Sequence, residues 1–513
     1  MRRTTELHGF TQMKTFRLKT KAAVAALAFA ALASSSLNAA EIPDRPEKLQ
    51  FKPLVYNPPN PAEFRVALKS GPIAYILPDK ELPLVNLVVK VRVGKYLEPK
   101  GKEGLASFVG YLLSKGGTKS WSAEEFEEHT AFLAADVNSG IGDTQGDVSV
   151  NLLSKDLDEG LKILREVLTS PRFQDDKIDL RRQQLLQRMK QRNDNSRDIE
   201  SRERSFLTRG ENFWSNRHST KASLESIAKS DLQAFHKAWF HPGNFVVAAN
   251  GDFDRDALIS KLEALFTDWP SRGATPPAIP TNTEFAKSGA YLVDKEVNQG
   301  RVSIVLPGIQ RDNPDFNAVR IMNDILGGGG FTSRIMNRVR SDEGLAYSAS
   351  SHFPGGVYYP SIFMAGFQSK SRTVAYASSI VIEEMERIRN EDVTDEEIQV
   401  SKASFIDTFP RNFGTKSQVA DTFSEDEFTG RYAKDKNYWK EYRDRVQAVT
   451  KAEIKRVAKK YLDPNKIVIL VVGAKDDLLK GHPDHPERLE SLAGGKVTEL
   501  PLRDPFTMRP MKE

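Results

Sequence analysis

Apolar and polar residues alternate at corresponding places in the two halves of the chain. In the first half every second residue of 85–93 is apolar, namely Val85, Leu87, Val89, Val91 and Val93. In the second half Val302, Ile304 and Leu306 repeat this alternation. A period of two predicts a half-buried strand. A helix is expected after each strand, over 104–115 and 316–326, and both run into glycines.

A second pair of segments repeats in the same order. DLQAFHKAWFHPGNFVVAANGDFD (231–254) corresponds to EIKRVAKKYLDPNKIVILVVGAKD (453–476), with Pro242 and Pro464 offset by 222 residues. Each segment predicts a helix, a turn that contains proline, a buried strand, and a glycine at the end of that strand. We therefore expect an internal duplication and an α+β fold, in which two homologous half-domains each carry a mixed sheet covered by helices on one face.

Composition shifts divide the chain into six expected segments. They are a signal peptide (1–40), an extended Pro-rich segment (41–63), an N-terminal domain (64–270), a linker (271–289), a C-terminal domain (290–475) and a tail (476–513). The linker is proposed from its proline and polar residues.

The first forty residues have the pattern of an export signal. A basic stretch (14–21) precedes an apolar stretch (22–33) and a run of small residues (34–40). The alternative is a buried N-terminal helix. The apolar stretch is too short to span a bilayer, and no other segment has eighteen uninterrupted apolar residues, so we expect no membrane span. The interpretation predicts an exported protein, periplasmic if the source is a Gram-negative bacterium.

Charge and composition exclude several classes of protein. The formal net charge is +5, but the first forty residues hold six of the 74 basic and one of the 69 acidic residues. The rest of the chain is balanced, which argues against nucleic acid as a partner. With no cysteine among 513 residues, disulfides, thiolate metal sites and a cysteine nucleophile are excluded.

Two further stretches carry a resemblance to a known family. They are GLASFVGYLLSKGGTKSWSAEEFEEH (104–129) and GGGGFTSRIMNRVRSDEGLAYS (327–348). The chain resembles the pitrilysin/insulinase family, zinc metallopeptidases with an inverted H-x-x-E-H motif. The resemblance covers nearly all of the chain after the expected signal peptide and implies the same two-domain fold.

The first stretch departs from the family at the zinc motif. Aligned on the family's GLAHFLEH, it places Ser107 and Tyr111 at the two histidines and Gly110 at the glutamate base. The family's third ligand, about 76 residues later, falls on Gln187 or Arg188. Catalytic zinc needs three His or carboxylate ligands and an open position for water. We therefore expect no metal or other cofactor in this chain, and zinc only in a partner.

The second stretch retains the residues that the family uses on substrate. Arg340 and Tyr347 are seven residues apart, as in family members, where the resemblance implies contact with the peptide at the scissile bond. A guanidinium and a phenol are suitable donors to a peptide carbonyl. The alternative is a surface arginine and a core tyrosine.

The resemblance implies a non-catalytic subunit that binds peptide and supplies this Arg/Tyr pair in trans to a zinc-bearing H-x-x-E-H partner. A structural or assembly protein on the same scaffold is the alternative. A self-sufficient peptidase with a rearranged site is a weaker one.

Three other patterns are weaker indications of a functional site. His482 and His485 have H-x-x-H spacing, but the neighbouring prolines favour an exposed tail over a metal site. The acidic run ending at His129 predicts a solvated helix face. The segment 181–209 holds nine basic and four acidic residues, which leaves a solvated helix, a docking surface or a wall facing peptide C-termini open.

Overall fold

The computed structural model describes residues 44–45, 49, 55–270, 273–492 and 494–511. The expected signal peptide lies outside these residues. Residues 57–513 form one compact unit, to which the following description applies. In the described part of the chain, every helix is too short or too polar to cross a membrane.

The first half of this unit contains a sheet, the helices that cover it, and helix α7, which packs on the sheet of the second half. Its strands are β1 (Arg65–Ala67), β2 (Ile73–Pro78), β3 (Leu84–Val91), β4 (Asp136–Ile141), β5 (Gly146–Leu153) and β6 (Phe245–Gly251). Its helices are α2 (Pro61–Phe64), α3 (Leu105–Lys115), α4 (Ala123–Phe132), α5 (Leu157–Thr169), α6 (Asp175–Lys190), α7 (Ser196–Arg209), α8 (Lys221–Ser226), α9 (Lys229–Trp239) and α10 (Arg255–Phe266).

The second half repeats the plan with more helices. Its strands are β7 (Gly289–Asp294), β8 (Gln299–Pro307), β9 (Ile309–Gln310), β10 (Ala346–His352), β11 (Gly355–Gly356), β12 (Ile362–Lys370), β13 (Val468–Gly473) and β14 (Val497–Glu499). Its helices are α11 (Phe316–Asn323), α12 (Arg334–Met336), α13 (Val374–Asn390), α14 (Asp395–Thr408), α15 (Lys416–Phe428), α16 (Arg431–Lys434), α17 (Tyr438–Gln447), α18 (Lys451–Tyr461), α19 (Lys475–Lys480) and α20 (Leu489–Leu492). The helix expected over 316–326 ends at Asn323 and continues as a wider turn (Asp324–Gly328) into the glycine run.

The two sheets confirm the duplication. Their strand orders are β1-β2-β6-β3-β5-β4 and β10-β12-β8-β13-β7-β14, so the five strands β2 to β6 have counterparts in the same places. Both sheets are mixed: β2 and β6, like β7 and β13, run parallel, whereas β6 and β13 pair antiparallel with β3 and β8. The sixth strand differs: β1 precedes its sheet in the chain, whereas β14 comes from the expected tail and pairs parallel with β7.

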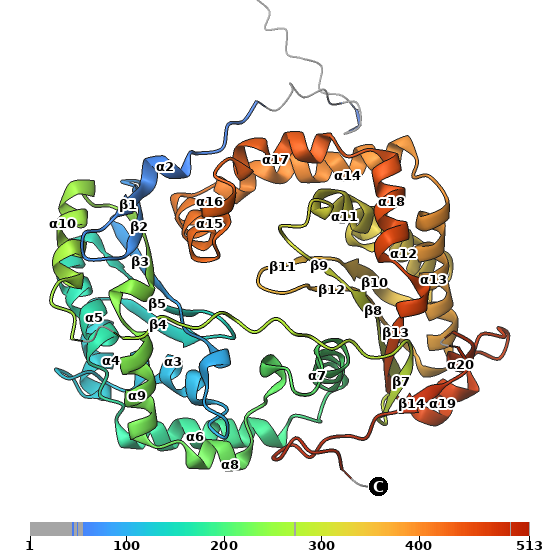
Figure 1. Ribbon diagram of the computed structural model, residues 1–513, viewed down its shortest axis with the longest axis horizontal. Coiled ribbons are helices and arrows are strands. Elements are labelled where there is room, and N and C mark those ends of the chain that lie inside the picture. Colours follow the sequence, from blue (N-terminus) through green and yellow to red (C-terminus); the bar gives the residue numbers. More distant parts are fainter. Residues whose placement is uncertain (1–43, 46–48, 50–54, 271–272, 493, 512–513) are drawn as a thin grey trace, which may run out of the picture. The chain divides into compact units, whose positions relative to one another are not determined.

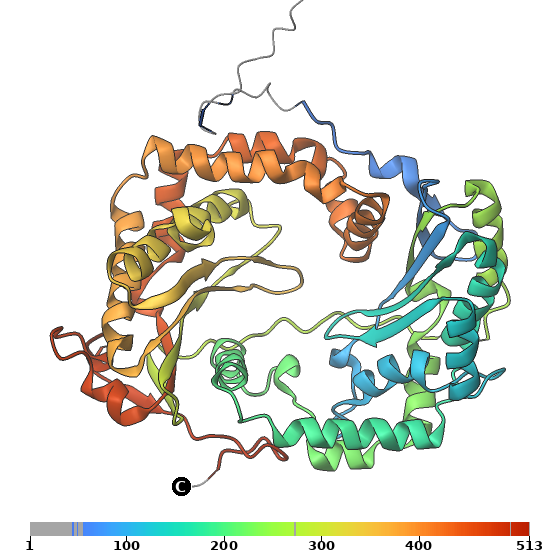
Figure 2. The ribbon, with the colours of Figure 1, turned by 180° about the vertical axis from the view of Figure 1, so that it is seen from behind.

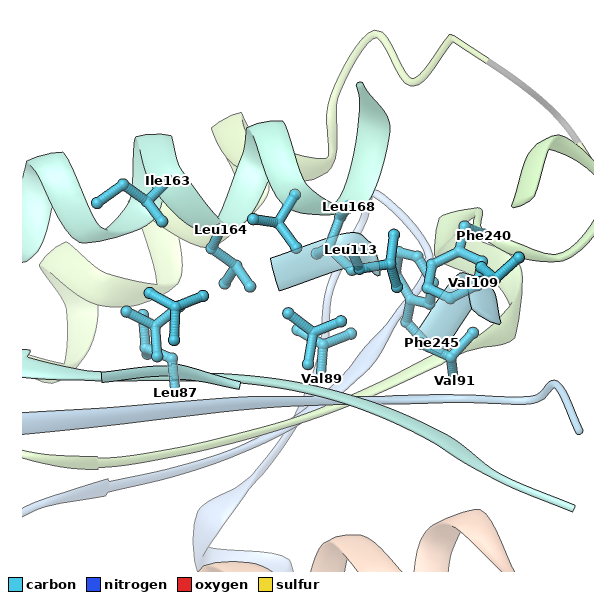
Figure 3. Close-up of a cluster of buried hydrophobic side chains, with 14 of the residues drawn as sticks. Leu87, Val89, Val91, Val109, Leu113, Ile163, Leu164, Leu168, Phe240 and Phe245 are labelled. Carbon is cyan, nitrogen blue, oxygen red and sulfur yellow. The ribbon is translucent and has the colours of Figure 1, made fainter. Parts of the chain in front are cut away.

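The helices of the first half pack on one face of its sheet. Alternate residues of β3 point into a core shared with α3 and α5, as the period of two predicts (Figure 3). The labelled core residues from these three elements are Leu87, Val89, Val91, Val109, Leu113, Ile163, Leu164 and Leu168.

The opposite face of each sheet is covered in part by a helix of the other half, which the sequence did not predict. Helix α15 lies against β2 and β6, and helix α7 lies against β8 and β13 (Figures 1 and 2). On the α7 side, Ile199 is fully buried against Val293 and Leu470, and the Ser303 hydroxyl donates to the Glu200 carboxylate. The two halves therefore exchange one helix each.

The contact between α15 and the first sheet combines the buried ring of Phe423, which lies against Tyr75, with several ion pairs. Lys90 on β3 is 4% exposed, and its Nζ lies 2.8 Å from Asp421 and 2.9 Å from Glu425. Glu427 accepts from the Tyr75 hydroxyl at 3.0 Å and pairs with Arg65 at 2.9 Å. Burial lowers the pKa of Lys90, but the two carboxylates outweigh it and hold that pKa above the ordinary value.

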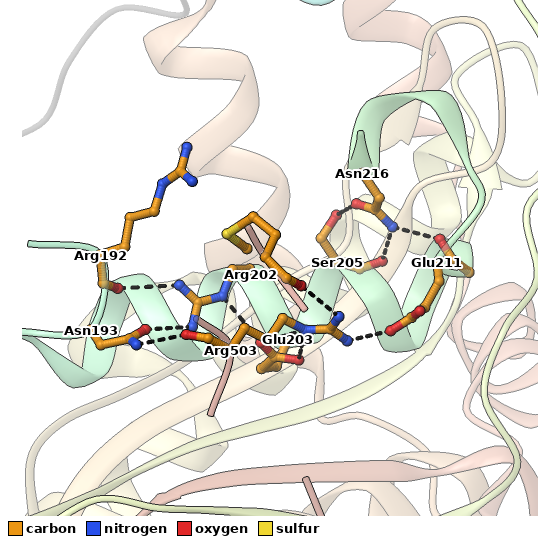
Figure 4. Close-up of polar contacts among 10 residues, drawn as sticks. Arg192, Asn193, Arg202, Glu203, Ser205, Glu211, Asn216 and Arg503 are labelled. Carbon is orange, nitrogen blue, oxygen red and sulfur yellow. Dashed lines mark hydrogen bonds and ion pairs between the residues drawn. The ribbon is translucent and has the colours of Figure 1, made fainter. Parts of the chain in front are cut away.

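The C-terminal segment packs against α7. The Arg503 guanidinium donates to Glu203 at 3.2 Å and also pairs with Glu211, while its backbone carbonyl accepts from Asn193 at 2.8 Å (Figure 4). Arg202 bonds the Arg192 carbonyl at 3.2 Å. Arg182 and Arg192 of the basic segment 181–209 likewise donate to backbone carbonyl groups, of Leu224 and Pro505.

We predict that Lys90→Ala destabilises the chain by about 2–4 kcal/mol, because it removes a buried cation that two carboxylates from the other half surround. Lys90→Met keeps the aliphatic packing and is expected to lose less than half as much. Urea unfolding monitored by circular dichroism measures both. A Lys90→Ala variant within 0.5 kcal/mol of the parent would contradict this packing of α15.

Candidate functional site

Helix α3 carries Ser107, Gly110 and Tyr111, the positions that we expect to correspond to the zinc motif. Its apolar side is fully buried, and this burial stabilises the helix although a glycine lies in its middle. Gly104, which precedes the helix, has no side chain that could cap it. The side chain of Glu98, in the preceding turn, caps the helix instead. Its Oε1 accepts from the backbone N–H groups of Gly104 (3.0 Å) and Ala106 (2.9 Å).

At Gly110 the backbone of β4 lies directly on the backbone of α3. A Cβ atom at this position would be 2.4 Å from the Ile141 nitrogen and 2.8 Å from the Gly140 carbonyl carbon. The Ser139 hydroxyl lies 2.6 Å from the Gly110 carbonyl and accepts from the Ser114 N–H at 3.0 Å, so a strand residue inserts into the helix hydrogen bonds. The strand therefore occupies the space that a side chain at 110 would need.

A guanidinium group lies between the other two motif positions. The Cζ atom of Arg181, on α6, is 4.1 Å from the centre of the Tyr111 ring, and its Nη2 makes a long hydrogen bond of 3.5 Å to the Ser107 hydroxyl. Arg181 is 8% exposed. Burial, followed by the charge of Arg188, lowers its pKa. This cation–π contact was not predicted, although Arg181 begins the basic segment singled out in the sequence.

The sequence offset had pointed instead to Gln187 and Arg188 as the third ligand position. Both side chains are exposed on α6. The side chain of α6 that reaches Ser107 and Tyr111 is Arg181, about two helical turns earlier.

Zinc does not fit these residues. Within the described ranges, no group of three or more His, Cys, Asp or Glu side chains could hold a metal ion. The motif positions present two hydroxyls, a glycine and a fixed positive charge, which would repel a divalent cation.

Beside Ser107 lies a polar pocket of about 230 Å³, lined also by Lys95, Glu98, Asp143 and His218. Burial raises the pKa of Glu98 to about 7 and lowers that of His218 to about 3. Burial likewise lowers the pKa of Lys95, whose Nζ donates to the Ser215 carbonyl at 2.7 Å. The Oε2 atom of Glu98 and the Nε2 atom of His218 are buried without a hydrogen-bond partner among the described residues.

The structure brings Arg340 and Tyr347 together at the surface. Tyr347 is 86% exposed and lies where the β10–β12 pairing shifts register, so the irregular strand turns its side chain outward. The Arg340 Cζ atom is 4.9 Å from the centre of the Tyr347 ring and 4.7 Å from that of Phe331, which is 66% exposed. Phe331 was missed, because only its place in the glycine run distinguishes it in the sequence.

Within the described part of the chain, the Arg340 guanidinium therefore contacts two aromatic rings rather than a counter-ion. Among the described residues no carboxylate pairs with Arg340, unlike Arg338, which lies 2.9 Å from Glu384. The N–H groups of Arg340 can therefore donate to a carbonyl oxygen, and the Tyr347 hydroxyl is a second donor beside them.

The remaining sequence candidates make local contacts. His485 stacks on Tyr376 at 3.6 Å between ring centres, and His482 lies next to it. His129 pairs with Glu159 at 2.8 Å on the surface of α4.

Comparison with known proteins places both halves in one family. Residues 76–215 match the family described as Insulinase (Peptidase family M16), and residues 226–405 match the Peptidase M16 inactive domain. The chain is 25% identical over 355 residues to the non-peptidase homolog YmxG of Helicobacter pylori, covering 67% of this chain and 79% of that protein.

Two further matches agree. An uncharacterized zinc protease of Rickettsia felis is 25% identical over 295 residues, covering 56% of this chain and 68% of that protein. The crystal structure of a peptidase M16 inactive domain from Pseudomonas fluorescens superimposes with a TM-score of 0.70 at 23% identity, covering 80% of this chain and 97% of that one. At this identity the structural match supports the fold alone.

Gly110→Ala is expected to lose about 2–4 kcal/mol of stability, because the new methyl group collides with strand backbone that cannot rotate away. Gly140→Ala, on β4, is the matched control: a Cβ there meets nothing within 4 Å, and we expect a change within about 0.5 kcal/mol. Thermal and urea unfolding measure the two. Equal stability of both variants would show that α3 and β4 are further apart.

Glu98→Gln is expected to be more stable than the parent by up to about 3 kcal/mol at pH 8. The folded pKa of about 7 lies above the unfolded value, so the folded parent binds the extra proton and loses stability as pH rises from about 4.5 to 7. The advantage of the variant should therefore grow over this window and vanish below about pH 5. His218 titrates in both proteins and cancels in the difference. A difference independent of pH would contradict the buried carboxyl.

Proposed function

Because the chain belongs to the pitrilysin/insulinase (M16) peptidase family and its motif positions hold no metal ligands, we propose that it is a non-catalytic subunit of a two-chain peptidase. In this proposal the chain binds peptide and supplies Arg340 and Tyr347 to an active site whose zinc is held by an H-x-x-E-H partner. The expected signal peptide extends the proposal to an exported protein, periplasmic in a Gram-negative source.

The main support is the contrast between the two motif regions. Around Gly110 the space of the family's glutamate is filled by β4, and Arg181 supplies a fixed positive charge between Ser107 and Tyr111. At the other region, Arg340 lies over two exposed rings and pairs with no carboxylate among the described residues. A region that keeps exposed aromatic rings and an unpaired cation is suited to a ligand from outside.

The chemistry assigned to this chain is hydrogen bonding. The Arg340 N–H groups and the Tyr347 hydroxyl donate to a carbonyl of the bound peptide and hold it in position, and they stabilise the oxyanion that forms there in the transition state. The partner's metal supplies the activated water. This chain contributes positioning and charge stabilisation, with no proton transfer of its own.

The test uses the chain co-expressed with an H-x-x-E-H partner from the same host. We expect the pair to co-purify, zinc to be found in the partner only, and Arg340→Ala with Tyr347→Phe to lower kcat/KM for peptide hydrolysis by about 100-fold. Lys459→Ala, which removes an exposed cation on α18, serves as the control and should leave hydrolysis unchanged.

Three outcomes would count against the proposal. Stoichiometric zinc and turnover by the isolated chain would indicate a self-sufficient peptidase. A stable complex whose hydrolysis tolerates the double substitution would indicate a structural or assembly role. Failure to co-purify with any such partner would remove the subunit role altogether.

A further inference from the structure

A row of amide side chains crosses the first sheet on the face opposite its core. Asp136 on β4 pairs in register with Asn151 on β5, Asn151 with Asn86 on β3, and Asn86 with Asn250 on β6. Cross-strand partners point to the same face, so the four side chains form one line, here called the asparagine row. The neighbouring residues of β3 and β5, Leu87 and Val150, point the other way into the core.

The row lines a cleft of about 870 Å³. Its opposite wall is formed by residues 413–417, the turn before α15 and the first residues of that helix. Leu82 and Leu84 border the cleft and are 62% and 37% exposed. Helix α15 covers β2 and β6 further along the same face, so the row lies beside the region that it covers.

The amides keep hydrogen-bonding groups that the protein does not use. Asn86 Nδ2 donates to Asn250 Oδ1 at 3.2 Å, which leaves the Asn86 oxygen and the Asn250 amino group. In the described part of the chain Asn151 makes no side-chain hydrogen bond. All three asparagines are half-buried rather than fully solvated. Amides placed there cost stability unless a ligand or water bonds them.

A carboxamide has the same donor and acceptor as a peptide group, so each free amide can pair with main-chain N–H and C=O groups. Neighbouring strands are about 4.8 Å apart, and the row therefore spans roughly 14 Å, the length of about four extended residues. Apart from Asp136 at one end the row itself is uncharged, while Asp79, Glu81 and Lys416 line other parts of the same cleft. The hydrogen bonds that the row offers to main-chain groups do not depend on the charge of the peptide's side chains.

We propose that the asparagine row is a subsite that hydrogen-bonds the main chain of an extended, unfolded polypeptide with little regard to its sequence. The inference rests on the proposed function and adds to it a second place of contact with the peptide main chain, apart from Arg340 and Tyr347. Helix α15 brings the second half of the chain to this subsite.

The test measures binding of two unrelated, unstructured, fluorescein-labelled ten-residue peptides to the full chain by anisotropy. We expect similar affinities for the two sequences and about tenfold weaker binding of their backbone N-methylated forms. Asn151→Leu should weaken both unmodified peptides about fivefold to tenfold, since one or two hydrogen bonds are lost. The double variant Asn86→Leu/Asn250→Leu should weaken peptide binding to the same extent. Because both members of the Asn86–Asn250 hydrogen bond are replaced together, neither amide is left without its partner.

Gln187→Leu removes an exposed amide on α6 and is the matched control, expected to bind as the parent does. In the row variants the N-methylated and unmodified peptides should differ less than in the parent, while the unmodified peptides still bind measurably. Circular dichroism and unfolding of each variant confirm that it is folded.

The outcomes separate this inference from the proposed function. Peptide binding that the row variants leave unchanged overturns the inference, even if Arg340→Ala still lowers hydrolysis by the zinc-bearing partner. Binding that the row variants weaken, together with hydrolysis indifferent to Arg340 and Tyr347, supports the row and overturns the subunit role. Row-dependent binding of an oligosaccharide such as chitohexaose, but not of peptide, overturns the assignment of polypeptide.

Discussion

The contact between α3 and β4 at Gly110 determines what the motif helix can do. Two backbones approach so closely there that only a hydrogen atom fits between them, and a strand hydroxyl replaces part of the helix's own hydrogen bonding. The helix keeps its apolar packing, so the fold does not depend on the lost metal. A glutamate at this position would require the edge strand to move. A zinc-binding motif on α3 would therefore require a different position of β4 as well as different residues at 107, 110 and 111.

The rest of the candidate site is consistent with this change. Arg181 places a positive charge between Ser107 and Tyr111, two of the positions expected to correspond to zinc ligands, and its guanidinium lies over the Tyr111 ring. This charge belongs to the protein and offers no exchangeable ligand. Polar groups that are still accessible lie elsewhere, on the exposed Arg340 cluster and along the asparagine row.

Sequence patterns predicted the parts of the fold that depend on neighbouring residues. The alternation over 85–93 gave β3, and the paired segments ending at Gly251 and Gly473 gave the duplicated helix, turn and strand. The exchange of α7 and α15 was not predictable, because amphipathic helices do not specify which sheet they cover. Arg181 and the asparagine row were missed for a related reason: each depends on register or helix phase between segments far apart in the chain. The edge strand β14 is too short, at three residues, to give a periodic signal.

The exchange of helices has a consequence for synthesis of the chain on the ribosome. When the first half emerges, the face of its sheet around Lys90 and Tyr75 has no cover, since α15 lies more than 300 residues further along. The two carboxylates that pair with Lys90 from α15, Asp421 and Glu425, are likewise made only after the whole first half. The first half can therefore complete its folding only after most of the second half has been synthesised.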